Sequence, residues 1–244
     1  MAPPDTAPII PIRFSIDGYT LKGYLHLPPH AAKPPVVIGS HGLFSDGGSP
    51  KQIALAAECN RLGLAFFRFH HRGCGESAGD FETATSLENR CRDLRAAIEL
   101  LRARPETGNR CGIFGSSIGG ATALSLCSGY PVDALVTLAA PVCSAPILAA
   151  AKKTGDLRGM SVSFYEERLT FDLSASLPLI SRILVIHGED DQVVPVSNAY
   201  AIHAGAAEPK RLIIQPHGDH QVTHPEHQTQ FIREAGAWFA CRLR

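Results

Sequence analysis

The sequence predicts an α/β fold with a mostly parallel, eight-stranded sheet, helices on both faces and a small lid insertion. Short, almost wholly apolar segments alternate with amphipathic segments of helical period, which is typical of parallel strands covered by helices on both sides. The 244 residues are 45% hydrophobic and 19% charged. A chain of this length and composition can bury a large core without metal or disulfide support.

The strands are expected where apolar residues run together between turn signals. They are residues 9–16, 19–27, 36–40, 64–69, 111–114, 134–139, 183–187 and 212–215. Asp17-Gly18 joins the first two as a hairpin turn. Because ligands bind beyond the carboxyl ends of parallel strands, the polar sequences that follow the later strands are where chemistry is expected.

The helices are expected over residues 50–62, from 85 onward, and over 118–127, 196–203 and 226–241. Thr85 and Glu88 form a capping box that opens the second helix. The spacing of its apolar residues predicts a buried face. That face is Leu87, Cys91, Leu94, Ile98 and Leu101, which leaves Arg90, Arg92, Arg95 and Glu99 facing water.

Residues 9–244 are expected to form one domain, with residues 142–179 as a lid and residues 1–8 as a loose N-terminal segment. The apolar stretch 134–151 contains Pro141 and Pro146. Two prolines at that spacing break a helix, so a buried strand followed by a loop is expected here and not a membrane span.

Charge and cysteine content exclude several classes of protein. The 23 basic residues balance the 23 acidic ones, so the domain has no overall positive charge that would bind the phosphates of a nucleic acid. The N-terminus has no basic start or long apolar segment, and the seven cysteines contain no C-x-x-C pair. We therefore expect reduced thiols, a cytoplasmic location and no cofactor. The oligomeric state stays open, a homodimer included.

A nucleophile is indicated by Gly115-Ser116-Ser117-Ile118-Gly119, which fits G-x-S-x-G between a strand and a helix. The turn lifts Ser117 above the sheet, and the helix amides point at charge developing beside it. Residues 75–79 match the same pattern around Ser77. No helix is expected after them until Thr85, so they are interpreted as a surface loop. Ser116 is the adjacent alternative.

An activated serine needs a base, and the base needs a group that fixes its tautomer. His220 follows a strand end and precedes the last helix, which makes it the candidate base. The turn after residues 183–187 offers three carboxylates, of which Asp191 is the candidate acid, Asp190 its rival and Glu189 third. His187 is expected to pack against the sheet.

The C-terminal histidines allow a metal site as an alternative. They are His217, His220, His224 and His227. Gly218 and Pro225 interrupt any single helical face and no cysteine joins them, so no metal is expected.

Two backbone amides should stabilise the oxyanion formed by attack on a carbonyl. Ile118 follows the nucleophile and supplies one; the loop 41–44 supplies the other, at Leu43. His41, Gly42 and Phe44 of that loop are the expected substrate-binding residues.

These motifs together resemble the α/β-hydrolase family. The resemblance runs from about residue 9 to 239 and rests on His41-Gly42 and on the segments 72–77, 115–120, 187–195 and 218–220. It is strongest to small cinnamoyl or feruloyl esterases and to serine-aminopeptidase-like hydrolases. It implies Ser117 as nucleophile, Asp191 as acid and His220 as base.

The resemblance implies a carboxylesterase that acts on a small-molecule ester through an acyl-enzyme. Apolar residues of the lid would line the cleft, or would simply dock the crossover on the core. Amide or thioester hydrolysis is the first alternative, and Glu166-Glu167 could hold the free amine that an aminopeptidase recognises. The second alternative is a non-catalytic binding module.

Overall fold

The structure is a computed structural model that describes residues 8–29 and 31–244. The loose segment expected at residues 1–8 lies, apart from residue 8, outside the described residues.

One sheet of eight strands runs through the protein in the order β1-β2-β4-β3-β5-β6-β7-β8. The strands are β1 (Ile9–Ile16), β2 (Tyr19–His26), β3 (Val36–Ser40), β4 (Ala65–Phe69), β5 (Cys111–Ser116), β6 (Ala134–Leu138), β7 (Ile183–Gly188) and β8 (Lys210–Gln215). The β1–β2 and β2–β4 pairs are antiparallel, and every later pair is parallel. The expected α/β fold with a mostly parallel sheet is confirmed.

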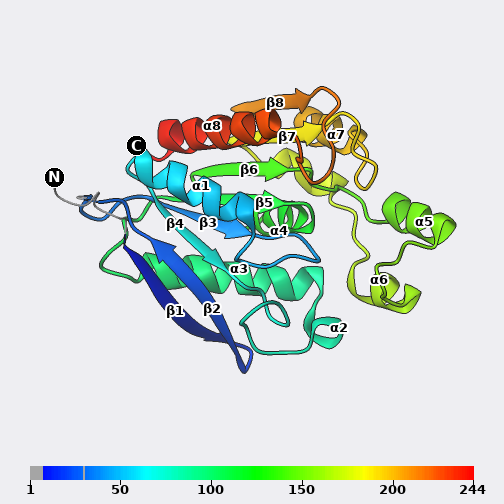
Figure 1. Cartoon of the computed structure of the whole chain (residues 1–244), viewed down its shortest axis with the longest axis horizontal. Coiled ribbons are helices and arrows are strands. Elements are labelled where there is room, and N and C mark those ends of the chain that lie inside the picture. The colour runs from blue at the N-terminus through cyan, green and yellow to red at the C-terminus, as the bar shows by residue number, and fades with distance from the viewer. Residues whose placement is uncertain (1–7, 30) are drawn as a thin grey trace.

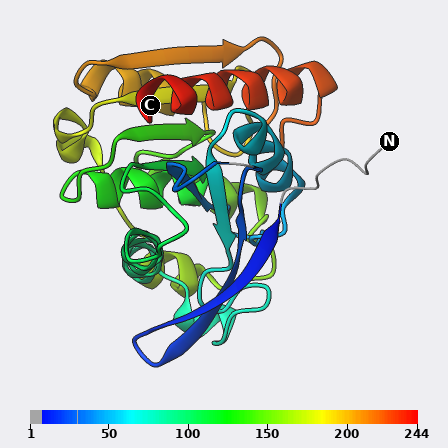
Figure 2. The same ribbon diagram turned by 90° about the vertical axis from the view of Figure 1, so that its left-hand side faces the viewer.

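Helices cover both faces of the sheet (Figure 1). On one face lie α1 (Pro50–Arg61) and α8 (Pro225–Arg242), which contribute Leu55 and Phe231 to one core cluster. On the other lie α3 (Leu87–Arg102), α4 (Ile118–Cys127) and α7 (Ser197–Gly205), which bury residues in a second cluster. Figure 2 shows the β1–β2 hairpin at the end of the sheet away from β8.

The Asp17-Gly18 hairpin turn and the helix expected over residues 50–62 are confirmed. Asp17 and Gly18 have φ values of 51° and 81°, which suit the primed turns that join two strands. Ser49 caps α1 by accepting a hydrogen bond from the Gln52 amide, and Gly63 follows the helix with a φ of 78°.

The start of α3 differs from the prediction. Its N-cap is Ser86, whose hydroxyl accepts a hydrogen bond from the Asn89 amide at 3.0 Å, so the capping box at Thr85 is wrong. The short helix α2 (Phe81–Ala84) begins after Asp80, where only loop was expected. Asp80 caps it by accepting a hydrogen bond from the Thr83 amide, so an aspartate N-cap before Thr85 marks this helix in the sequence.

The expectation that Arg90 faces water is also wrong, because its side chain is fully buried. Arg90 lies four residues before Leu94 and seven before Ala97, on the buried face of α3. The helical period therefore places Arg90 inside, and only the usual exposure of arginine argued against it.

Residues 142–179 leave the sheet after β6 and contain α5 (Ala145–Thr154), α6 (Val162–Arg168) and the 3-10 helix η1 (Ser174–Leu179). The loop expected after residue 139 is therefore wrong from Ala145 onward. Pro146 lies in the first turn of α5, where its missing N–H has no partner to lose. Figure 1 shows α5 and α6 beyond the carboxyl ends of β5 and β6.

No helix in the described part of the chain is long and apolar enough to cross a membrane. All seven cysteines are free thiols.

Candidate active site

Ser117 occupies a sharp turn between β5 and α4, with φ of 54° and ψ of −125°. This backbone conformation is strained for a residue with a side chain, and such strain is typical of functional turns. The glycines two residues before and two residues after it allow the turn, because a side chain at either position would meet backbone atoms. A Cβ atom on Gly119 would lie 2.1 Å from the Ser40 carbonyl oxygen, and one on Gly115 would lie 2.4 Å from the Gly119 carbonyl oxygen.

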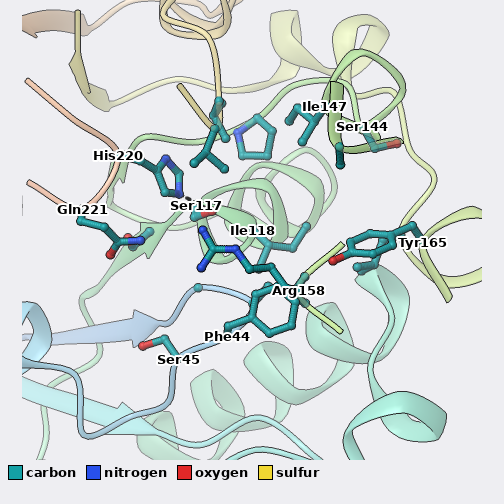
Figure 3. A pocket seen from close by; sticks show the side chains of 18 of the residues that line it. Phe44, Ser45, Ser117, Ile118, Ser144, Ile147, Arg158, Tyr165, His220 and Gln221 are labelled. Atoms are coloured by element: carbon teal, nitrogen blue, oxygen red, sulfur yellow. Dashed lines mark hydrogen bonds between the residues drawn. The ribbon is translucent and has the colours of Figure 1, made fainter. Parts of the chain in front are cut away.

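Three predicted side chains meet at this turn (Figure 3). The Ser117 hydroxyl lies 3.2 Å from His220 Nε2, and His220 Nδ1 lies 2.7 Å from Asp191 Oδ2. Because the carboxylate accepts the Nδ1 proton, Nε2 is free to accept the serine proton. The arrangement can therefore remove a proton from Ser117 and stabilise the imidazolium that forms.

Asp191 is the carboxylate of the turn that faces inward. Its side chain has no exposed surface, and its Oδ1 accepts hydrogen bonds from the Val193 and Val194 amides at 2.9 and 2.8 Å. Glu189 and Asp190 are exposed, and Asp190 faces His217. Burial raises the pKa of Asp191, but hydrogen bonds with histidine and backbone donors outweigh it and hold that pKa well below its usual range.

Close backbone contact between two turns brings Asp191 to His220. A Cβ atom on Gly188 would lie 2.3 Å from the Gly218 carbonyl oxygen. That same oxygen accepts a hydrogen bond from the Asp190 amide at 2.9 Å. The glycine at the end of β7 therefore lets the carboxylate turn pack directly on the histidine turn.

His187, expected only to pack against the sheet, is a second histidine against Asp191. Its Nε2 lies 2.8 Å from the Val194 carbonyl oxygen and 3.3 Å from Asp191 Oδ2. Since both neighbours are acceptors, Nε2 carries the proton and fixes the carboxylate from behind. The sequence signal for this role is a histidine near the end of a buried strand, four residues before the acid.

The loop after β3 lies against the nucleophile. A Cβ atom on Gly42 would lie 3.7 Å from Ser117 Cβ. The amides of Leu43 and Ile118, the expected oxyanion donors, have no hydrogen-bond acceptor among residues 8–29 and 31–244. Both amides are therefore available to a ligand, and both residues line the same cavity.

The buried side chain of His41 supports this loop from within the protein, and His41 also borders the cavity. Its Nδ1 donates to the Gly42 carbonyl at 2.8 Å, and its Nε2 accepts from the His71 amide at 3.1 Å. Burial, together with the charge of Arg90, lowers the pKa of His41 well below its usual value, so the ring is neutral. Arg90 donates to the His41 carbonyl.

A buried polar network lies behind His41. His71 Nε2 lies 3.0 Å from the Ser40 hydroxyl, and its Nδ1 lies 3.3 Å from Asp93 Oδ2. Arg72 Nε donates to the other oxygen of Asp93 at 2.8 Å. This serine, histidine and aspartate have the order of a catalytic triad, but all three are buried, so they serve the structure.

A cavity of about 370 Å³ opens beside Ser117 and His220. Phe44, half exposed, lies on its wall, as do residues of α5 and α6. The lid segment is docked by aromatic rings, because Phe81 lies 5.7 Å from both Phe44 and Phe164 between ring centroids. Arg168 adds a hydrogen bond to the Thr83 carbonyl at 2.6 Å.

The other motifs from the sequence have structural partners. The Ser77 hydroxyl donates to the His70 carbonyl at 2.6 Å and accepts from the Lys22 amide, as a loop residue would. His224 caps α8 by accepting from the Glu226 amide. Among the described residues the C-terminal histidines share no metal-binding group, because only His217 joins one, with exposed Glu189 and Asp190.

Comparison with known proteins identifies the family of the chain. The family described as "Serine aminopeptidase, S33" matches residues 31–165. The uncharacterized protein YfhR of Escherichia coli K12 is 32% identical over 201 residues, which cover 81% of this chain and 67% of that protein. The uncharacterized protein Rv2307c of Mycobacterium tuberculosis is 30% identical over 203 residues, which cover 82% and 68%.

Solved structures of low sequence identity share the fold. A dienelactone hydrolase from Anabaena variabilis has a TM-score of 0.76 at 23% identity, covering 98% of this chain and 100% of that one. Est1E from Butyrivibrio proteoclasticus, solved with ferulic acid, has a TM-score of 0.79 at 19% identity, covering 95% and 98%. These findings confirm the resemblance: the chain is a hydrolase of the α/β-hydrolase fold and belongs to the serine aminopeptidase S33 family.

Proposed function

We propose that the protein is a serine carboxylesterase that cleaves a small-molecule ester through an acyl-enzyme on Ser117. The observation that supports this most is the continuous chain of hydrogen bonds from Ser117 through His220 to the buried carboxylate of Asp191. It provides a nucleophile, a base and an acid in the relation that acyl transfer needs.

In the proposed reaction, Ser117 Oγ attacks the carbonyl carbon while His220 Nε2 takes its proton. The Leu43 and Ile118 amides donate to the oxyanion. His220 then gives the proton to the leaving oxygen, and the alcohol departs. Water enters, loses a proton to His220 and attacks the acyl carbon. His220 then returns that proton to Ser117 Oγ as the bond between Oγ and the acyl carbon breaks, which releases the carboxylic acid.

The cavity suits a small, partly apolar acyl group. Its volume of about 370 Å³ lies at the small end of the range for ligand pockets. Apolar side chains from the lid segment line it: Ile147, Leu148, Leu169 and Phe171, with Tyr165 beside them. We infer that residues 142–179 act as a lid that selects the acyl group.

An aminopeptidase is the less favoured alternative. Recognition of a free amine needs a carboxylate near the nucleophile, but Glu166 pairs with Lys152 and neither Glu166 nor Glu167 lines the cavity. Asp156 is the acidic residue on the cavity wall, and it pairs with Arg158 at 3.4 Å. The charges around the cavity therefore do not favour an amine.

The test compares hydrolysis of p-nitrophenyl acyl esters with that of aminoacyl anilides and acyl thioesters. We expect turnover of the esters, loss of almost all of it in Ser117→Ala, and retention in Ser77→Ala, which changes the serine of the other G-x-S-x-G match. Faster cleavage of aminoacyl anilides would favour the peptidase. Full activity in Ser117→Ala would refute the proposal.

A further inference from the structure

The cavity beside Ser117 has two chemically different ends. Most of the lid residues that line it are apolar, with Asp156 and Arg158 as a charged pair among them, whereas the other end is polar and is formed by Ser45, Ser49, Lys51, Gln52 and Gln221. In Figure 3 the labelled Ser45 and Gln221 lie on one side of the Ser117–His220 pair, and Ile147 and Tyr165 lie on the other. The scissile bond would therefore lie where the two ends meet.

Lys51 brings a positive charge to the polar end. It is the second residue of α1, and its Nζ donates to the Gln221 carbonyl at 3.0 Å. Within residues 8–29 and 31–244 no carboxylate lies within salt-bridge distance of it. An ammonium group has three donors, so donors remain for a ligand. Burial lowers the pKa of Lys51 by more than the charges of Asp219 and Asp191 raise it, and a bound anion would offset the remaining cost.

Gln52 is a second, independent sign of a polar ligand. Its side chain is 1% exposed, and neither its Nε2 nor its Oε1 has a hydrogen-bond partner among the described residues. The amide lies over β3, where a Cβ atom on Gly39 would be 2.1 Å from Oε1. A buried amide without partners is costly, and Gln52 borders the cavity, so a rotation of its side chain toward the cavity would let a ligand's polar atoms satisfy it.

The position of His220 assigns this end to the leaving group. His220 must give its proton to the leaving oxygen, so that oxygen lies at Nε2 in the reaction. Lys51 holds Gln221, the residue next to His220. The alcohol part of the ester would therefore extend toward Lys51, and the acyl part toward the lid.

On the basis of the proposed esterase function, we propose that Lys51 and Gln52 form a subsite for a carboxylate on the leaving alcohol. The substrate class is then an acyl ester of a hydroxy acid. Lys51 supplies the charge, and Gln52 supplies an amide donor. The other cation on the cavity wall, Arg158, is 55% exposed and already pairs with Asp156.

The test uses two esters of the same shape, 3-(butanoyloxy)benzoate and 3-(butanoyloxy)benzamide, which differ in the charge of the leaving group. A charge-assisted hydrogen bond contributes about tenfold or more in affinity. We expect Lys51→Gln to reduce the benzoate-to-benzamide ratio of kcat/KM by about tenfold or more, mainly through KM. Comparing the two enzymes cancels the intrinsic reactivity of the esters.

Three further variants act as controls. Lys51→Arg should keep the preference because it keeps the charge. Arg158→Gln and Lys153→Gln should keep it too, because they remove charges from the lid side. An unchanged ratio in Lys51→Gln would overturn the proposal, and so would a ratio that falls only in Arg158→Gln. A preference for an anion on the acyl side, measured with p-nitrophenyl hemisuccinate against p-nitrophenyl pentanoate, would overturn the assignment to the alcohol.

A binding measurement separates this subsite from the esterase function. Calorimetry with Ser117→Ala compares 3-hydroxybenzoate with 3-hydroxybenzamide and needs no turnover. We expect about tenfold or tighter binding of the benzoate, lost when Lys51→Gln is added. If no ester is cleaved but this preference holds, the subsite stands and the esterase proposal fails; equal binding of both ligands would overturn the subsite whatever the enzyme cleaves.

Discussion

Asp191→Asn tests how the carboxylate orients His220. The Asp191 Oδ1 atom accepts two backbone amides, so in the variant the asparagine oxygen takes that position. Its NH₂ group then occupies the Oδ2 position, 2.7 Å from His220 Nδ1, where a donor would meet a donor. His220 must move its proton to Nε2, and that nitrogen can no longer accept the Ser117 proton. The cost of this wrong tautomer is about 10⁴ in kcat, or about 5 kcal/mol.

The assay is steady-state hydrolysis of p-nitrophenyl butyrate between pH 5 and 9, with circular dichroism to show that the variant is folded. Asp190→Asn is the matched control, since Asp190 is an exposed neighbour that faces His217 at 3.3 Å. It should stay close to the wild-type rate. The reasoning is refuted if Asp191→Asn stays within tenfold of wild type, or if Asp190→Asn is the variant that loses activity.

Three further results are expected. Gly119→Ala should lower the free energy of unfolding by about 1–3 kcal/mol and remove most of kcat, because its Cβ atom would lie 2.1 Å from the Ser40 carbonyl oxygen. Gly129→Ala is the control and should change neither quantity, because nothing lies within 4 Å of its Cβ atom. Equal stability of the two variants to urea would contradict this prediction. Phe164→Ala should lower the free energy of unfolding by about 3 kcal/mol, raise KM and speed proteolytic cleavage within residues 142–179. An unchanged rate of cleavage would argue against aromatic docking of the lid. Finally, Asp191 has a lower pKa folded than unfolded, so it stabilises the fold at neutral pH and loses that effect as the pH falls below about 4. The difference in unfolding free energy between wild type and Asp191→Asn should therefore shrink in acid; a difference that grows there would contradict this sign.

Much of the fold and of the site could be predicted because the signals are local. The apolar runs of the parallel strands and the Asp17-Gly18 turn need no tertiary information. The same is true of Ser117, where the two glycines reflect close backbone contacts within one turn. His220 followed from its place after the last strand.

The parts that could not be predicted depend on tertiary contacts. The sequence placed Asp191 and Asp190 side by side, and the packing of Gly188 against Gly218 decides which of them faces His220. Arg90 was expected in water, because local reasoning does not show the carbonyl of a distant loop that it binds. The helix α5 replaces the expected loop because Pro146 lies in the first turn, where a proline does not break a helix.

The proposed acyl-enzyme is tested most directly by mass spectrometry of the protein after reaction with a fluorophosphonate. This reagent labels a serine only when a neighbouring base activates it. We predict one adduct, on the peptide that contains Ser117, and none in His220→Ala. An adduct on another serine, or no adduct on folded protein, would contradict the proposal and favour a binding role for the cavity.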